Sequence, residues 1–288
     1  MKAILKHELS SYFTGLTAYV FAAFILLFGG MYTMVYNLNA LVADFQYVVS
    51  SMSFVFLIII PILSMRVLAE EKRQKTSQLL YSLPITMTQV VLGKYFAQLV
   101  VFAVPVAILG IYPLILSAFG NVHFPAAYGA LVGFYLLGAA LLSIGMFVSS
   151  LTESQPVAAG LCFVVMLLNY FVAALAGFVP STALASFGAF SLVALVLGVI
   201  VWLMTRSGFT AAAVFVALEG IETVVFILNS SLFEGAFGNL MERISLFEQF
   251  YRFVDGVFDI RSIVYFISVI AVFLFLSVQS LEKGRWSE

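Results

Sequence analysis

Charged side chains are scarce in this 288-residue sequence, and the densest group of them falls in one segment, RVLAEEKRQKTSQLLYSLP at residues 66–84. Thr76 is a suitable N-cap for a helix, and Pro84 disfavours its continuation past the preceding residue. Three leucines recur on one side of the turn between them, namely Leu79, Leu80 and Leu83. The segment therefore predicts a short amphipathic helix whose apolar face is covered either by a partner protein or by lipid headgroups.

A second group that could do chemistry is a pair of carboxyl groups, Glu219 and Glu222, in the middle of an apolar stretch. Residues three apart share one face of a helix. A charge at the centre of a bilayer costs about 2.5 to 3.5 kcal/mol on insertion scales, so both groups are expected to face protein or water, or to be protonated. The pair is either a contact for a cation, proton or substrate, or a structural pair satisfied by neighbouring backbone and hydroxyl groups.

Other catalytic and metal-binding patterns are missing from the sequence. Its two histidines, His7 and His123, lie far apart, and Cys162 is the only cysteine. The only Gly-Lys pair ends at Lys94 and is followed by Tyr95, without the upstream glycine of a phosphate-binding loop. The sequence therefore predicts no metal site, no cofactor or ATP bound by this chain, and no enzyme activity of its own.

The composition identifies the solvent that these residues must face. Apolar residues make up 63% of the chain and charged residues only 9%, with a mean hydropathy of +1.13, so lipid rather than water is the main solvent. Backbone polar groups inside a bilayer are satisfied only in helices or closed barrels, and apolar runs of helical length favour helices. We expect an all-α, polytopic transmembrane bundle. The net charge of −1 excludes nucleic acid as a main partner.

About eight stretches are long and apolar enough to cross a bilayer as helices. They are 16–36, 47–65, 91–118, 127–149, 156–178, 184–204, 208–232 and 261–281. We expect the two spans within 184–232 to be an addition to a six-span core. We treat 1–288 as a single transmembrane domain, because no repeat or long linker interrupts it.

The basic residues predict the orientation of the bundle, since short cytoplasmic loops carry the excess of Lys and Arg. With eight spans and a cytoplasmic N-terminus, every Lys and Arg lies inside except Arg243, Arg252 and Arg261. Both termini are therefore expected in the cytoplasm, and residues 66–90 form a cytoplasmic loop. Residues 1–15 are expected to form a helix lying on the lipid surface. Residues 233–260 are expected to form an extracytoplasmic amphipathic segment, which caps the bundle, dips into lipid or touches an accessory protein.

The pattern AEEKRxxTxxLLxxLP, followed by Gly-Lys before the next span, resembles the membrane subunits of type-2 ABC transporters, and the gliding-motility permease group is nearest. The opening KHELSSYF and the closing FDIRSIVYF and LEKGRW extend the resemblance to both ends of the chain. It implies the permease subunit of an ABC exporter in a bacterial cytoplasmic membrane. It also implies a homodimer or a pair with a related permease, and ATP hydrolysis on a separate cytoplasmic subunit.

In that family the loop forms a coupling helix that docks on the ATP-binding subunit. The resemblance assigns this contact to Thr76–Leu83 and the residues that flank it. The implied ATPase-coupling residues are Glu70, Glu71, Lys72, Arg73, Thr76, Leu79, Leu80, Leu83 and Pro84.

Two other classes stay open. An ion-coupled secondary transporter would use Glu219 and Glu222 and would move its substrate without an ATPase. A non-transporting membrane scaffold would function without the leucines of the cytoplasmic loop.

Overall fold

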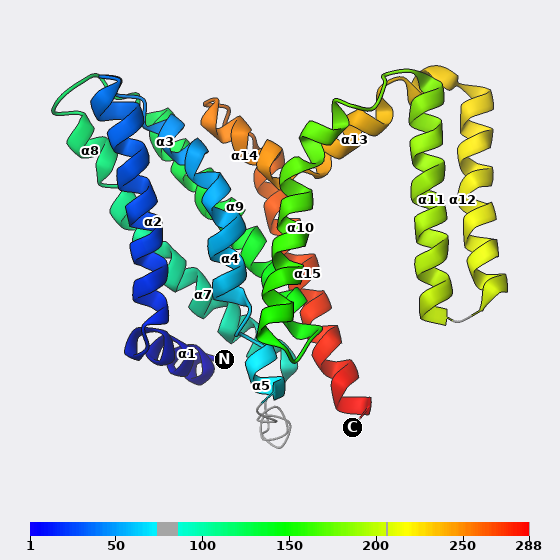
Figure 1. Cartoon of the computed structure of the whole chain (residues 1–288), viewed down its shortest axis with the longest axis horizontal. Helices are drawn as coiled ribbons and strands as arrows, with labels where there is room; N and C mark the ends of the chain where they lie inside the picture. The colour runs from blue at the N-terminus through cyan, green and yellow to red at the C-terminus, as the bar shows by residue number, and fades with distance from the viewer. Residues whose placement is uncertain (74–85, 206, 288) are drawn as a thin grey trace. The chain divides into compact units, whose positions relative to one another are not determined.

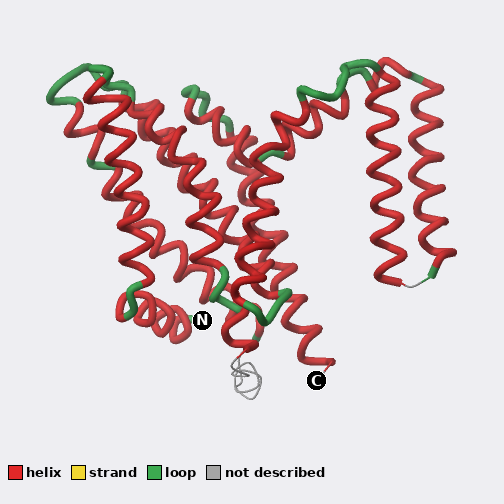
Figure 2. Tube along the Cα trace, viewed as in Figure 1, coloured by secondary structure: helices red, strands yellow, loops and turns green. Residues whose placement is uncertain are grey.

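The computed structural model describes residues 1–73, 86–205 and 207–287, and every regular element in that part of the chain is a helix (Figures 1 and 2). Among the residues that the structure describes, seven helices are long and apolar enough to cross a membrane. They are Thr17–Asn39, Phe45–Ser64, Met87–Leu116, Phe124–Ser150, Gln155–Ala176, Gly208–Leu228 and Ile260–Lys283. The one predicted span outside this set, 184–204, corresponds to α11, Ala183–Thr205. The prediction of an all-α polytopic bundle is confirmed.

Several spans are built from more than one helical element. The first joins α2 (Thr17–Thr33) to a π-helical turn, η1 (Met34–Asn39). The second joins α3 (Phe45–Met52), the short η2 (Ser53–Val55) and α4 (Phe56–Ser64). The third joins α7 (Met87–Leu109) to α8 (Tyr112–Leu116). The remaining long helices are α9 (Phe124–Ser150), α10 (Gln155–Ala176), α12 (Gly208–Leu228) and α15 (Ile260–Ser287).

The described chain divides into two compact units: residues 1–168 with 249–288, and residues 169–248. In the first unit α9 lies at the centre and packs against α3, α4, α7 and α15. Aromatic rings fill this core, with Phe56 stacked on Phe134 at 4.3 Å between ring centroids and Phe102 edge-on to Phe56. Glycines on α9 permit the close approach: a Cβ added at Gly145 would lie 2.6 Å from the Cβ of Ser64 on α4.

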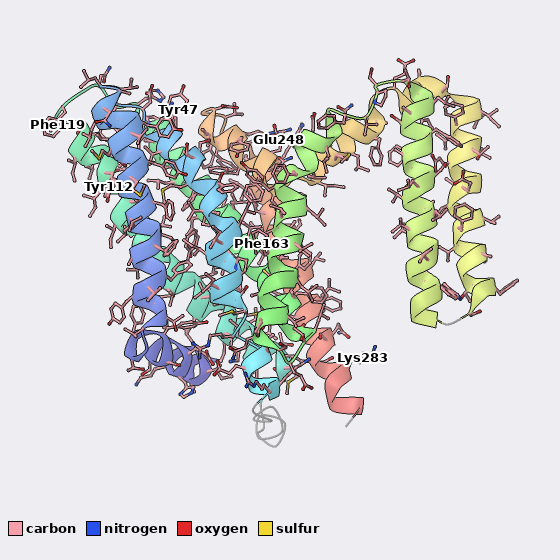
Figure 3. The ribbon with its side chains drawn as sticks, in the orientation of Figure 1. Tyr47, Tyr112, Phe119, Phe163, Glu248 and Lys283 are labelled. Atoms are coloured by element: carbon pink, nitrogen blue, oxygen red, sulfur yellow. The ribbon has the colours of Figure 1, made fainter. Side chains whose placement is uncertain are left out.

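One end of the first unit carries both chain termini. The N-terminal helix α1 (Lys2–Thr14) runs across the start of α2, at the same end of the unit as α5 (Ala69–Arg73) and the C-terminal end of α15 (Figure 1). Lys283 marks this end and Phe119, between α8 and α9, marks the opposite one (Figure 3). We call the end with α1 and α5 the terminal end.

In the second unit α11 and α12 form an antiparallel hairpin (Figure 1). Phenylalanines join the hairpin to η3 (Ser230–Phe233) and α13 (Ala236–Ile244). The predicted amphipathic stretch 233–260 is two helices, α13 and α14 (Leu246–Val254), rather than one continuous stripe. The break falls at Ser245, whose hydroxyl accepts a hydrogen bond from the Glu248 amide at 3.1 Å and so caps the new helix. Asn169 of α10 also accepts from the Leu246 amide, at 3.1 Å.

Candidate functional site

The turn that leads from α4 into α5 is held by a single buried hydroxyl group on α9. Ser149 donates to the carbonyl oxygen of Met65 at 3.1 Å and accepts from the amides of Leu68 at 3.2 Å and Ala69 at 3.1 Å. A serine hydroxyl has one proton and two lone pairs, so these three bonds use its full capacity. Ser149 therefore fixes the start of the segment that follows α4 to the end of α9.

The same end of α9 binds Lys72. The ammonium group of Lys72 donates to the carbonyl oxygen of Ser150, the last residue of α9, and Ser280 of α15 donates to that oxygen at 3.1 Å. The last carbonyl groups of a helix have no partner inside the helix, and its C-terminus favours a positive charge. Lys72 and Ser280 meet both requirements, so α5, α9 and α15 are joined at one atom.

The other predicted coupling residues divide into two groups. Arg66, one turn earlier, donates from its Nε atom to Oε2 of Glu70 at 3.2 Å and forms an ion pair with it. Arg73 is exposed at the end of α5. Glu71 lies on α5, but only its backbone is described. The predicted contacts Thr76, Leu79, Leu80, Leu83 and Pro84 lie outside the described residues.

The chain re-enters the bundle at α7, whose first turn is capped by Thr86, with its hydroxyl accepting from the Gln89 amide at 3.3 Å. One turn further on, α7 packs against α1. A Cβ added at Gly93 would lie 3.0 Å from a methyl carbon of Ile4, so the glycine lets the two helices approach closely.

A buried ion pair strengthens this contact. Lys94 of α7 donates to Glu8 of α1 at 2.7 Å, and the Lys94 side chain is only 4% exposed. Burying a charge is costly unless an opposite charge compensates it, so the pair fixes the register of α1 on α7. Tyr12 lies near Glu8 and Arg66. Burial and the Glu8 charge raise the pKa of its phenol, whereas the Arg66 charge lowers it.

Residues 65–73 and 86–94 together form what we call the loop base. Its first half is bonded to α9, at a carbonyl group that α15 also bonds, and its second half is bonded to α1. The described residues of the loop base hold no nucleophile and base arranged for catalysis. The arrangement is suited instead to transmitting a displacement of the intervening segment to three helices of the first unit, because each link is a hydrogen bond or ion pair rather than a loose apolar contact.

The two membrane carboxyl groups lie in the second unit, on the face of α12 that meets α11. Ser191 of α11 donates to Glu219 at 2.9 Å. The other oxygen of Glu219 and one oxygen of Glu222 are buried without a hydrogen-bond partner among the residues that the structure describes. The hydroxyl partner agrees with a structural role for Glu219, and the two remaining oxygens are the only support for an ion site. Within the described ranges, no group of three or more His, Cys, Asp or Glu side chains is placed to hold a metal ion.

The contacts that sequence reasoning missed all join distant parts of the chain. They involve Ser149, Ser150, Ser191, Ser280 and Glu8. Serine is common in membrane helices and usually bonds to its own helix, as Ser143 does with the Ala140 carbonyl at 2.7 Å. The one signal that could have found a partner is the pair of opposite charges, Glu8 and Lys94, next to apolar segments.

The family model described as "ABC-2 family transporter protein" matches residues 3–283, from α1 to the end of α15, and so includes both halves of the loop base. No curated protein matches the sequence. Since the match covers nearly the whole chain and agrees with the type-2 ABC transporter pattern read from residues 69–84, the chain belongs to the ABC-2 family of transporter proteins.

Proposed function

We propose that this chain is the permease of an ATP-driven exporter, and that residues 66–84 couple it to a separate ATPase. Membership of the ABC-2 family makes it a membrane permease component of an ABC transporter, one that is not itself catalytic, and implies a cytoplasmic ATP-binding partner. The proposal adds the direction of transport, the coupling residues and the route by which ATP-driven motion enters the bundle.

The observation that carries the proposal is the loop base. Ser149 and Lys72 tie residues 65–72 to the end of α9, which Ser280 of α15 also bonds, while Lys94 ties the start of α7 to α1. A segment docked on a moving ATPase would therefore push on the bundle from both of its ends.

The mechanism that follows is mechanical. Closure of two ATP-bound partner subunits displaces the segment between α5 and α7, and the bonded ends carry this displacement into the packed helices. Packed cores switch between discrete arrangements rather than deforming continuously, so a small shift at the loop base can reorganise the bundle. Glu70, Glu71, Lys72 and Arg73 stand where the moving segment joins the bundle. Thr76, Leu79, Leu80, Leu83 and Pro84 are assigned to the docking contact.

The wider assembly is part of the same proposal. The resemblance to gliding-motility permeases supports a homodimer or a pair with a related permease in a bacterial cytoplasmic membrane. The distribution of Lys and Arg supports cytoplasmic termini, and the terminal end of the first unit carries both of them. Residues 233–260 would then face the opposite side of the membrane and are available to an accessory protein. Neither a cofactor of its own nor a nucleic acid enters this scheme.

Co-purification with the ATPase tests the proposal. We expect the tagged wild-type chain to retain its ATPase and to stimulate ATP hydrolysis, and the double variant Leu79→Asp, Leu80→Asp to lose both, because two charges replace the apolar docking face. The control is Leu41→Asp, a change at a 91% exposed leucine in the loop before α3. Its positive φ of 56° suits Asp better than Leu. An ATPase retained by the double variant would contradict the proposed contact.

The two alternatives have less support. Ion coupling rests on single buried oxygens of Glu219 and Glu222, and Ser191 already satisfies part of that pair. The same double variant distinguishes a scaffold from an exporter, because a scaffold would keep its function without the leucines of the loop.

A further inference from the structure

A groove runs between α2 and α4 in the first unit, with a volume of about 260 Å³. Its walls are apolar over most of its length. They are formed by Val20, Phe21, Phe24, Ile59, Ile62 and Leu63. Three of these side chains are also open to the surroundings, with Val20 55%, Phe24 41% and Ile62 49% exposed. In a bilayer this surface meets acyl chains.

The groove has a positively charged end. Arg66 lines it where α4 leads into α5, beside Leu16 and Thr17 at the start of α2. Because α2 and α4 run in opposite directions, these three residues lie at the terminal end of the first unit and Phe24 lies deeper in the membrane span (Figure 1). The positive end of the α2 dipole therefore adds to the arginine charge.

Arg66 keeps donors for a ligand although it already has a partner. Its Nε atom binds Glu70 at 3.2 Å, and the side chain remains 50% exposed. A guanidinium group has two further nitrogens, and its planar fork matches the oxygens of a phosphate. Glu70 thus orients the group without using its full capacity.

A ligand that fills the groove must be apolar along the walls and anionic at the Arg66 end. An inorganic anion would gain nothing from apolar walls, and an uncharged hydrocarbon would gain nothing from Arg66. A phospholipid with an anionic headgroup satisfies both, because its acyl chain can follow α2 and α4 while its phosphate reaches the charged end. Basic pockets between transmembrane helices are a general form of anionic lipid site.

We propose that the α2–α4 groove binds one acyl chain of an anionic glycerophospholipid whose phosphate is held by Arg66. The site rests on the proposed function only for the choice of leaflet: with cytoplasmic termini, the lipid comes from the inner leaflet. Binding itself requires neither an ATPase nor transport.

Native mass spectrometry of the purified full-length chain tests the site, with delipidated protein titrated with phosphatidylglycerol or with phosphatidylcholine of the same acyl chains. We expect the wild type to prefer phosphatidylglycerol. Arg66→Gln should weaken that binding about tenfold, the loss of a charge-assisted contact, and bring it to the level of phosphatidylcholine. The matched control is Arg261→Gln, at an exposed arginine at the opposite end of α15 from Lys283.

A second pair of variants tests the apolar part. Ile62→Trp fills the groove and should weaken both lipids roughly tenfold, comparable to excluding about two methylene groups. Ile58→Trp, at a 46% exposed position one turn earlier on α4 and outside the groove, should leave both unchanged. These variants do not alter the charged end, so they remain informative if Arg66→Gln fails to fold.

Three results would overturn the proposal. They are equal binding of the two lipids by the wild type, unchanged phosphatidylglycerol binding in Arg66→Gln, and a switch from dimer to monomer in Ile62→Trp with lipid binding retained. The last result would make the groove an interface between copies of the chain. The assay contains no ATP and no ATPase, so failure of the coupling proposal would leave its outcome unchanged.

Discussion

At the scale of single residues, hydroxyl groups and one ion pair form the hydrogen bonds at the loop base that water would form with an exposed loop. Ser149 is fully buried and pairs two amides and one carbonyl of the turn after α4. Unpaired backbone groups in an apolar surrounding are costly, so one side chain determines whether this turn is stable.

Replacing Ser149 with alanine should therefore lower the stability of the folded chain by about 2 kcal/mol, since buried amides lose their acceptor. Thermal melting in detergent micelles would measure the change. Ser143→Ala is the matched control: this serine is also buried on α9, but its hydroxyl bonds to its own helix, and the effect should stay below about 1 kcal/mol. Equal melting temperatures for the two variants would show that Ser149 does not hold the turn.

At the scale of helices, the sequence predicted most of what the structure contains. Apolar runs of about 20 residues identify spans because the thickness of the bilayer sets their length. The π-helical turn at Met34–Asn39 and the break at Ser245 were not predicted, because neither depends on hydropathy. The break has a local signal of a different kind, because Ser245 and Glu248 have the Ser-x-x-Glu spacing of a helix N-terminus. Asn169, which lies far away in the sequence, adds a bond to the Leu246 amide that local patterns cannot specify.

Close packing of α4 on α9 gives a prediction at this scale. A methyl group added at Gly145 would lie 2.3 Å from the Oγ and 2.6 Å from the Cβ of Ser64. A Cβ atom cannot rotate away, so Gly145→Ala must separate the two helices and should cost about 2 kcal/mol.

Gly160→Ala on α10 is its counterpart, because an added Cβ there has nothing within 4 Å. That change should raise stability by up to about 1 kcal/mol through helix propensity alone. Melting temperatures of the two variants should therefore move in opposite directions. A destabilised Gly160→Ala or an unaffected Gly145→Ala would contradict the packing described for α9.

At the scale of the whole molecule, the candidate site was predictable only in part. The charge cluster and the leucine spacing located the cytoplasmic loop and its family resemblance. The anchoring of that loop was not predictable, because Ser149, Ser280 and Glu8 are separated from it by tens of residues in the sequence. The sequence located the proposed coupling loop, whereas the structure shows which helices its ends are bonded to.

Lys72 and Arg73 are neighbours with different surroundings, and this difference allows the proposed docking and transmission roles to be tested separately. Lys72 binds the end of α9, whereas Arg73 is exposed. We expect Lys72→Met to retain the ATPase in co-purification but to lower the stimulation of ATP hydrolysis several-fold, because α5 loses its bond to the C-terminus of α9 and only the Ser149 link remains. Arg73→Met should weaken binding of the ATPase instead.

Ser280→Ala should resemble Lys72→Met with a smaller effect, since it removes the other hydrogen bond to the Ser150 carbonyl. Lys72→Arg should restore most of the stimulation, because a cation again faces the C-terminus of α9. Binding and ATP hydrolysis measured on the same reconstituted complex distinguish these cases. If Lys72→Met lost the ATPase altogether, Lys72 would belong to the docking surface, and the link between α5 and α9 would play no part in transmission.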